Sequence, residues 1–333
     1  MEPEIQYIFL VDLLDVALSS IEFLTFREKS LLWENLSCAD ELCSLSREDI
    51  GSIIGRKIKS SGWDGKKCLA LAERCGLIME RFGIKAVSCR DPGYPAMLSE
   101  SFDPPYVIYF RGNLGCLEKK CVSIVGTRRI CARCAESTRD FASECASNGL
   151  TVVSGLAYGV DTFAHKGALS VDGGLTAAVL PGGIDSIAPR GNTALAARIL
   201  GSGGLLMSEY LPGLQPEAWR FVKRNRIVAA LSSVTVVTQA PPGSGALITA
   251  GFALDYNRYL MFHSDCFCAE AMETTEKAVR ELRMKNTGAA MSKLENSAES
   301  YVRDGAPVFS DFSGFLRAME CDAGRSGQLE LEF

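Results

Sequence analysis

The chain has 333 residues, 47% of them hydrophobic and 23% charged, and a formal net charge of −5. Such a chain can bury a full core, and we expect a globular protein of two domains that is not a general DNA-coating protein with a uniformly basic surface. The charge is uneven, because residues 119–226 carry 13 basic and 8 acidic side chains whereas residues 1–118 carry 13 and 18.

The cysteines and the apolar stretches indicate whether the protein is cytoplasmic, exported or membrane-bound. Thirteen cysteines without a spacing framework favour a reducing cytoplasm over a disulfide scaffold, and no basic, apolar leader opens the chain. The longest uncharged stretch, 227–254, is interrupted midway by Pro241, Pro242, Gly243 and Gly245, so we predict a buried strand and a helix rather than a membrane span. Cys131 and Cys134 have metal-ligand spacing but lack a second pair, so we predict no metal site and no cofactor.

Taken in order, the chain predicts four segments. Residues 1–81 have few strand signals and predict a small helical domain. Residues 82–118, rich in proline, glycine and aromatic residues, predict a connecting segment with a short strand. Residues 119–319 alternate apolar runs with helical stretches, which predicts an α/β fold with an open parallel sheet of about six strands and helices on both faces. Residues 320–333 are expected to form a tail.

The first two strands of this domain end in similar glycine turns. An apolar run over 121–125 stops at Gly126, a second over 150–153 stops at Ser154 and Gly155, and a helical stretch follows each. In a parallel strand-helix-strand unit the two turns lie side by side. Free backbone N–H groups and the positive ends of two helices then point at one place, which favours anions and above all phosphate.

The residues beside the turns fit phosphate better than catalysis. Thr127, Arg128 and Arg129 add a hydroxyl and two guanidinium groups. The glycine pattern of dinucleotide sites, the Lys-Ser/Thr pair of a P-loop and the Gly-x-Ser-x-Gly of a nucleophile elbow are all missing. Asp161 and His165 stand four apart on one helix face, which we interpret as a structural pair. We therefore predict no catalytic residues.

Two later stretches add basic and amide side chains, Pro189-Arg190-Gly191-Asn192 and Lys223-Arg224-Asn225-Arg226. Several phosphate sites in one groove suit a polymer better than a nucleotide, and strand-end loops suit a single strand better than a duplex. The predicted DNA-binding residues are Gly126, Thr127, Arg128, Arg129, Ser154, Gly155, Lys166, Arg190, Asn192, Arg224 and Asn225.

An ordered series of motifs carries a family resemblance. The motifs are VGTR (125–128), SGLAYGVDTFAH (154–165), PRGN (189–192), SEYLPG (208–213), RNRIVAALS (224–232) and SGALITA (244–250). Over roughly residues 82–318 the chain strongly resembles the DNA-processing protein A family, also called DprA or Smf.

The resemblance implies an extended Rossmann-like domain behind a helical, SAM-like domain. It also implies a homodimer that binds single-stranded DNA cooperatively and loads the RecA recombinase during natural transformation or related recombination. By similarity, Arg128 and Arg190 take the places of the family's principal DNA-contacting residues, whereas Tyr158 stands where many members carry a basic residue. Many members append a C-terminal winged helix, and the few residues after Met319 are too short for one.

Two other functions compete with this interpretation. Nucleoside-monophosphate phosphoribohydrolases share the fold and need Pro-Gly-Gly-x-Gly-Thr-x-x-Glu, where the glutamate assists glycosidic cleavage. Here Asp185 stands at a glycine position and the motif's glutamate is missing, which disfavours that enzyme. A purely structural adaptor would leave the clustered cations unexplained.

Overall fold

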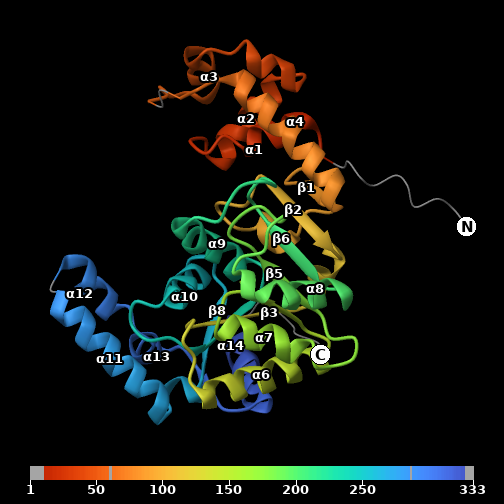
Figure 1. The fold of residues 1–333 in the computed structure, drawn as a ribbon. Helices are drawn as coiled ribbons and strands as arrows, with labels where there is room; N and C mark the ends of the chain where they lie inside the picture. The colour runs from red at the N-terminus through yellow and green to blue at the C-terminus, as the bar shows by residue number, and fades with distance from the viewer. Residues whose placement is uncertain (1–10, 60–61, 286, 327–333) are drawn as a thin grey trace, which may run out of the picture.

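The structure is a computed structural model that describes residues 11–59, 62–285 and 287–326 (Figure 1). A group of helices from the first part of the chain lies at one end of a large sheet, and further helices cover both faces of that sheet. The strands are β1 (Lys85–Ser88), β2 (Val107–Gly112), β3 (Cys121–Gly126), β4 (Thr151–Ser154), β5 (Thr176–Val179), β6 (Leu205–Ser208), β7 (Val234–Gln239), β8 (Tyr259–His263) and β9 (Val308–Phe309).

The helices alternate with the strands after β1. The α-helices are α1 (Leu13–Ser19), α2 (Phe26–Asn35), α3 (Arg47–Ile54), α4 (Gly65–Phe82), α5 (Ala96–Ser99), α6 (Ala132–Ser147), α7 (Val160–Ala168), α8 (Thr193–Gly201), α9 (Ala218–Ala230), α10 (Gly245–Asp255), α11 (Ala269–Lys285), α12 (Gly288–Glu295), α13 (Ala298–Arg303) and α14 (Phe312–Ser326). Short 3-10 helices are η1 (Ala39–Cys43), η2 (Leu114–Glu118), η3 (Arg190–Asn192) and η4 (Ser264–Phe267).

The N-terminal helices α1–α4 form because their ends are well capped. Thr25 and Ser46 each make a reciprocal capping box at the starts of α2 and α3. These helices share one apolar core with α8 and with the β1–β2–β6 end of the sheet. Tyr109 of β2 is fully buried in this core, and its hydroxyl lies 2.9 Å from the Ser19 hydroxyl of α1. Apolar packing therefore joins the helical part to the sheet.

The sheet has the order β1-β2-β6-β5-β4-β3-β7-β8-β9. From β6 to β9 all neighbours are parallel, while β1 and β2 add antiparallel strands at one edge. After β3 the chain builds outward through β4, β5 and β6 and then returns to the other side of β3 as β7. This reversal leaves a crevice at the carboxyl ends of β3 and β7, the place where open α/β sheets bind ligands.

Alternating side chains along the strands supply a separate core on each face. Val122 and Ile124 of β3 pack with α6, α7 and α14, whereas Val125 packs on the opposite face with α9 and α10. Nearly every residue of β3, β4, β5 and β7 is buried, as expected for parallel strands covered on both sides. The crevice is therefore held by rigid elements.

The predicted fold class is confirmed, with more strands than expected. The six predicted apolar runs form β3 to β8, and the stretch 227–254 contains β7 followed by α10. β1 and β9 have only four and two residues, too few for a periodic signal. Residues 82–118 contribute two strands to the same sheet, so they are more than a connection.

The C-terminal part departs from the sheet and returns to it. Residues after η4 form α11, α12 and α13, a helical arm beside the sheet, before β9 pairs with β8 (Figure 1). α14 extends to Ser326, so it reaches into the predicted tail, whose residues 327–333 lie outside the described part. Among the helices that the structure describes, none combines the length and the apolar character that a membrane span requires.

Candidate nucleic-acid interface

A pocket of about 510 Å³ lies in the crevice at the ends of β3 and β7. Seven of the eleven predicted site residues line it, namely Gly126, Thr127, Arg128, Arg129, Gly155, Arg224 and Asn225. The wall of the pocket also includes Phe221 and Val222 of α9 and Lys293 of α12. The topology thus brings together basic residues that are far apart in the sequence.

One wall of the pocket was missed by the sequence reasoning. Residues 243–246 and Ile248 line the pocket where α10 begins, and the Ser244 side chain accepts a hydrogen bond from the Ala246 N–H. The sequence identifies this stretch as a family motif that lacks the lysine of a P-loop, without placing it at the binding site. The start of an 11-residue helix still directs a positive dipole end toward the pocket. The signal was Ser-Gly directly before an apolar helical run.

The first glycine turn, between β3 and α6, presents its arginines to solvent. The Thr127 N–H donates to the Gln239 carbonyl at 2.7 Å, and the Thr127 carbonyl accepts from Val160 N–H at 3.1 Å. These bonds fix the start of the turn to β7 and α7. Arg128 and Arg129 project beyond it and are exposed, and the Arg128 guanidinium lies 4.8 Å from the centre of the Phe221 ring. The two cations therefore stand at the pocket without an ion-pair partner among the described residues.

In the second glycine turn, between β4 and α7, three successive backbone amides already have acceptors. The N–H groups of Gly155 and Ala157 both donate to the Asp161 carboxylate at 3.2 Å. The Leu156 N–H donates to His165 Nε2 at 3.3 Å. The following helix supplies these acceptors, so the N–H groups of residues 155–157 are not free to hold an anion, contrary to the expectation for Gly155.

Asp161 and His165 each accept hydrogen bonds from the second turn, and no bond between them is found in the described part of the chain, so the expected Asp161–His165 pair is absent there. Burial raises the pKa of Asp161, and the positive charge of Arg224 and the two backbone N–H bonds oppose that rise. Burial lowers the pKa of His165 to about 3, so the ring is neutral. Since Nε2 accepts from Leu156, the proton sits on Nδ1, which faces the Thr176 hydroxyl at 2.7 Å.

Arg224 forms a wall of the pocket rather than an exposed contact. It is 3% exposed, and its Nη1 donates to the Val179 carbonyl at 2.8 Å. A Cβ atom on Gly155 would come within 1.5 Å of this Nη1, so the guanidinium lies directly on the second turn. Burial lowers the pKa of Arg224, and Asp161 opposes that shift.

Four predicted site residues lie outside the pocket. The Ser154 hydroxyl is buried and donates to the Ile124 carbonyl at 2.7 Å. The Asn192 amide is buried too and donates to the carbonyls of Leu156 and Ala157 and to the Thr162 hydroxyl. Both therefore hold the second turn in place.

The other two of the four are exposed, Lys166 on α7 and Arg190 at the start of η3. The loop that carries Arg190 touches Tyr158, whose hydroxyl lies 2.7 Å from the position that a Cβ atom on Gly191 would take. Tyr158 itself is 49% exposed. These side chains extend the polar surface beside the pocket.

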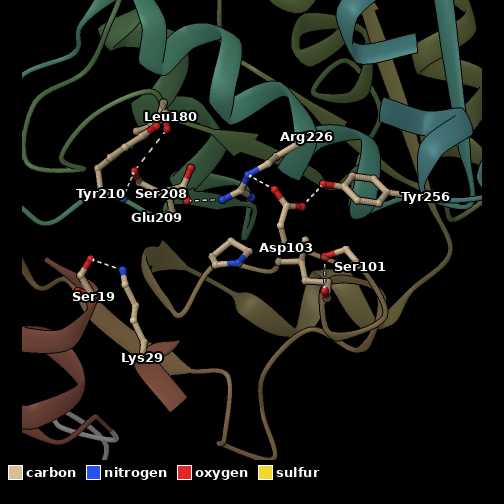
Figure 2. A network of polar contacts seen from close by, with 12 residues as sticks. Ser19, Lys29, Ser101, Asp103, Leu180, Ser208, Glu209, Tyr210, Arg226 and Tyr256 are labelled. Atoms are coloured by element: carbon tan, nitrogen blue, oxygen red, sulfur yellow. Dashed lines mark hydrogen bonds and ion pairs between the residues drawn. The ribbon is translucent and has the colours of Figure 1, made fainter. Parts of the chain in front are cut away.

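The remaining arginines of α9, Arg220 and Arg226, form ion pairs within the protein. Figure 2 shows Arg226 between Glu209, 2.5 Å away, and Asp103, 3.1 Å away, with Tyr256 donating to that second carboxylate. Arg220 is buried and pairs with Glu217 and Glu22. Arg226 is therefore separated from the cationic cluster predicted from the sequence, because Glu209 and Asp103 neutralise its charge.

Comparison with known proteins identifies the family. The family model described as DNA recombination-mediator protein A matches residues 85–299, more than half of the chain. The chain belongs to this family. The recombination-mediator match begins at β1 and ends in α13, so it covers the sheet except β9 together with the whole pocket.

Individual members of the recombination-mediator family agree with this assignment. Protein Smf of Borreliella burgdorferi is 34% identical over 254 residues, which cover 76% of this chain and 79% of that protein. Alignments with Smf proteins of Synechocystis sp. and Escherichia coli cover only 51% and 44% of those proteins.

Solved structures of DNA processing protein A share the fold. The protein from Streptococcus pneumoniae superposes with a TM-score of 0.69 at 26% identity, over 92% of this chain and 98% of that one. The protein from Helicobacter pylori, whose structure addresses a single-stranded DNA binding mode, gives 0.50 at 32% identity over 58% of this chain and 87% of that one. The chain is thus a DNA-processing protein by family.

Proposed function

We propose that the protein binds single-stranded DNA across the pocket at the ends of β3 and β7. The observation that carries this is the pair Arg128 and Arg129, exposed at a pocket that also receives the positive end of α10. Guanidinium groups bind phosphate through paired, charge-assisted hydrogen bonds. The apolar side chains of Phe221, Val222 and Ile248 on the same wall offer surfaces on which bases can stack.

The geometry fits a single strand better than a duplex. The cations stand on a strand-end loop inside a crevice, whereas duplex recognition requires a protruding helix or ribbon that enters a groove. The acidic and histidine groups nearest the turns, Asp161 and His165, are engaged in backbone hydrogen bonds, so they support a scaffold role over catalysis. Asp185, at the position relevant to phosphoribohydrolases, accepts a hydrogen bond from the Gly213 N–H at 2.6 Å and lies outside the pocket.

Family membership supports the finer parts of the proposal. The protein acts as a homodimer in the cytoplasm, protects single strands during natural transformation or related recombination, and loads RecA recombinase on them. This part rests on the resemblance to DprA and Smf proteins. Its test is RecA-dependent ATP hydrolysis on single strands, which the wild type accelerates and Arg128→Ala does not.

The decisive experiment is a salt series of binding to a labelled single-stranded oligonucleotide, with the matching duplex as competitor. Arg128→Ala costs on the order of 1–3 kcal/mol of affinity and reduces the salt slope by about 0.7 for each lost phosphate contact. Arg198→Ala is the matched control, because Arg198 is an exposed arginine on α8 away from the pocket. No binding at low salt, or equal weakening by the control, would overturn the assignment.

A further inference from the structure

A second cluster of reactive side chains lies behind the arginine turn and plays no part in the pocket. The sulfur atoms of Cys131, Cys134 and Cys268 all lie within 4.8 Å of one another. Within residues 11–59, 62–285 and 287–326, no other three His, Cys, Asp or Glu side chains meet in this way. The sequence shows only the Cys131-x-x-Cys134 pair, because the third cysteine comes much later in the chain.

Two helices present their first residues to this cluster. Cys131 is the N-cap of α6 and Cys134 follows within its first turn. Cys268 ends η4 and directly precedes α11, and its carbonyl accepts the first helical hydrogen bond, from Met272 N–H at 2.9 Å. The positive ends of a 16-residue and a 17-residue helix therefore meet at three sulfurs. Such an environment favours thiolate over thiol.

Three thiolates within 4.8 Å of one another repel each other unless a cation lies between them. The only hydrogen bond from this group to the backbone runs, among the described residues, from the Cys134 thiol to the Asp265 carbonyl at 3.1 Å. A soft divalent cation offsets the cost, because it replaces the thiol protons and neutralises the thiolates together.

We propose that Cys131, Cys134 and Cys268 bind a thiophilic metal ion, Zn²⁺, through three thiolates, with water as the fourth ligand. Three sulfur donors of this spacing suit tetrahedral zinc, whereas a disulfide would use two of them and leave the third without a role. Cys131 and Cys268 are partly exposed, which leaves the fourth position open to solvent. Each thiol that coordinates the ion gives up one proton to the buffer.

The metal would link the start of α6 to the start of α11. Cys131 lies two residues after Arg129, and its N–H donates to the Gln239 side chain at 2.9 Å. Cys268 lies between β8 and the helical arm of α11–α13. Zinc would thus hold the end of the turn that carries Arg128 and Arg129 against the start of the helical arm α11–α13. The inference stands on the sulfur geometry alone and does not depend on DNA binding.

Titration of the reduced, metal-free full chain with Co²⁺ and then Zn²⁺ tests the site. We expect one ion per chain, sulfur-to-cobalt charge-transfer absorption that Zn²⁺ abolishes, and release of protons on binding. Cys131→Ser and Cys268→Ser lose this stoichiometric binding. Cys38→Ser, which removes an exposed cysteine far from the cluster, retains it.

A melting experiment separates ligation from folding. Zinc raises the melting temperature of the wild type and of Cys38→Ser and leaves both cluster variants unchanged, while all four melt alike without metal. Equal cobalt absorption in every variant would overturn the proposal. So would a wild type that binds no metal when reduced and instead forms a Cys131–Cys134 disulfide on exposure to air.

Discussion

The two glycine turns after β3 and β4 look alike in the sequence and differ in the structure. The first carries exposed Arg128 and Arg129 beside a pocket, whereas the amides of the second are bonded to Asp161 and His165. The difference comes from the helix that follows each turn. When a side chain of the following helix accepts hydrogen bonds from the N–H groups of a glycine turn, those groups cannot bind an anion. The residues of that helix therefore determine whether the turn can bind anions.

The largest effect should come from the contact that joins the two turns. Gly159 has φ 75° and ψ −130°, and a Cβ atom there would lie 2.2 Å from the Thr127 carbonyl oxygen. Gly159→Ala should therefore cost at least about 3 kcal/mol of unfolding free energy, because a backbone clash adds to an unfavourable backbone conformation. Urea denaturation measures this.

Gly76→Ala is the control for that substitution. It lies inside α4 with open space where its Cβ would point, and it should stabilise the protein slightly. Equal stability of the Gly159→Ala and Gly76→Ala proteins would show that the two turns are not rigidly joined.

The next effect isolates the second turn. Asp161→Ala leaves two buried N–H groups without an acceptor, at about 1–3 kcal/mol each, so unfolding free energy should fall by about 2–6 kcal/mol. Affinity of the folded protein for single strands should hold or rise, because Asp161 lines the pocket as a carboxylate. Asp172→Ala, an exposed control, should change neither quantity. Weakened binding in the Asp161 variant would mean that the second turn also holds phosphate.

A pH series sharpens the same contrast. The pKa of His165 is about 3 when folded and 6.5 when unfolded, so the unfolded chain binds the extra proton as pH falls below 6.5. Stability is therefore lost toward acid, by about 2 kcal/mol between pH 7 and pH 5 from this group. His165→Gln should flatten that part of the profile in urea melts. A profile as steep as the wild type's would place the acid sensitivity elsewhere, for instance at His263, whose pKa burial also lowers.

The smallest expected effect concerns the edge of the binding surface. Arg190 is exposed but lies outside the pocket, next to Tyr158 of the second turn. Arg190→Ala should cost about 1 kcal/mol of affinity for single strands without changing the melting temperature. Fluorescence anisotropy at two salt concentrations measures both the loss and its ionic part. A loss as large as that of Arg128→Ala would extend the interface across both turns.

Features that depend on neighbouring residues along the chain, such as strands and turns, could be predicted from the sequence. Six apolar runs became β3 to β8, and the first turn emerged with its cations exposed as expected. Residues whose role depends on distant partners were misplaced: Asn192 and Ser154 are buried hydrogen-bond donors, and Arg224 is enclosed against Gly155. The sequence around an asparagine or arginine does not show whether its side chain faces solvent or packs against another loop. Burial is decided by the packing of α7 and α9 against the sheet.

The pairing of β2 with β6 has a consequence for how the protein is made. Tyr109 pairs with Ser208, so β2 can pair early with β1 but meets its second neighbour, β6, only after β3, β4 and β5 have left the ribosome. The N-terminal helices can form earlier because their caps are local, but the core that they share with Tyr109 and Leu206 must wait. An apolar edge thus stays uncovered during much of translation. We expect truncations that end before β6 to aggregate, which sedimentation of stalled nascent chains would measure.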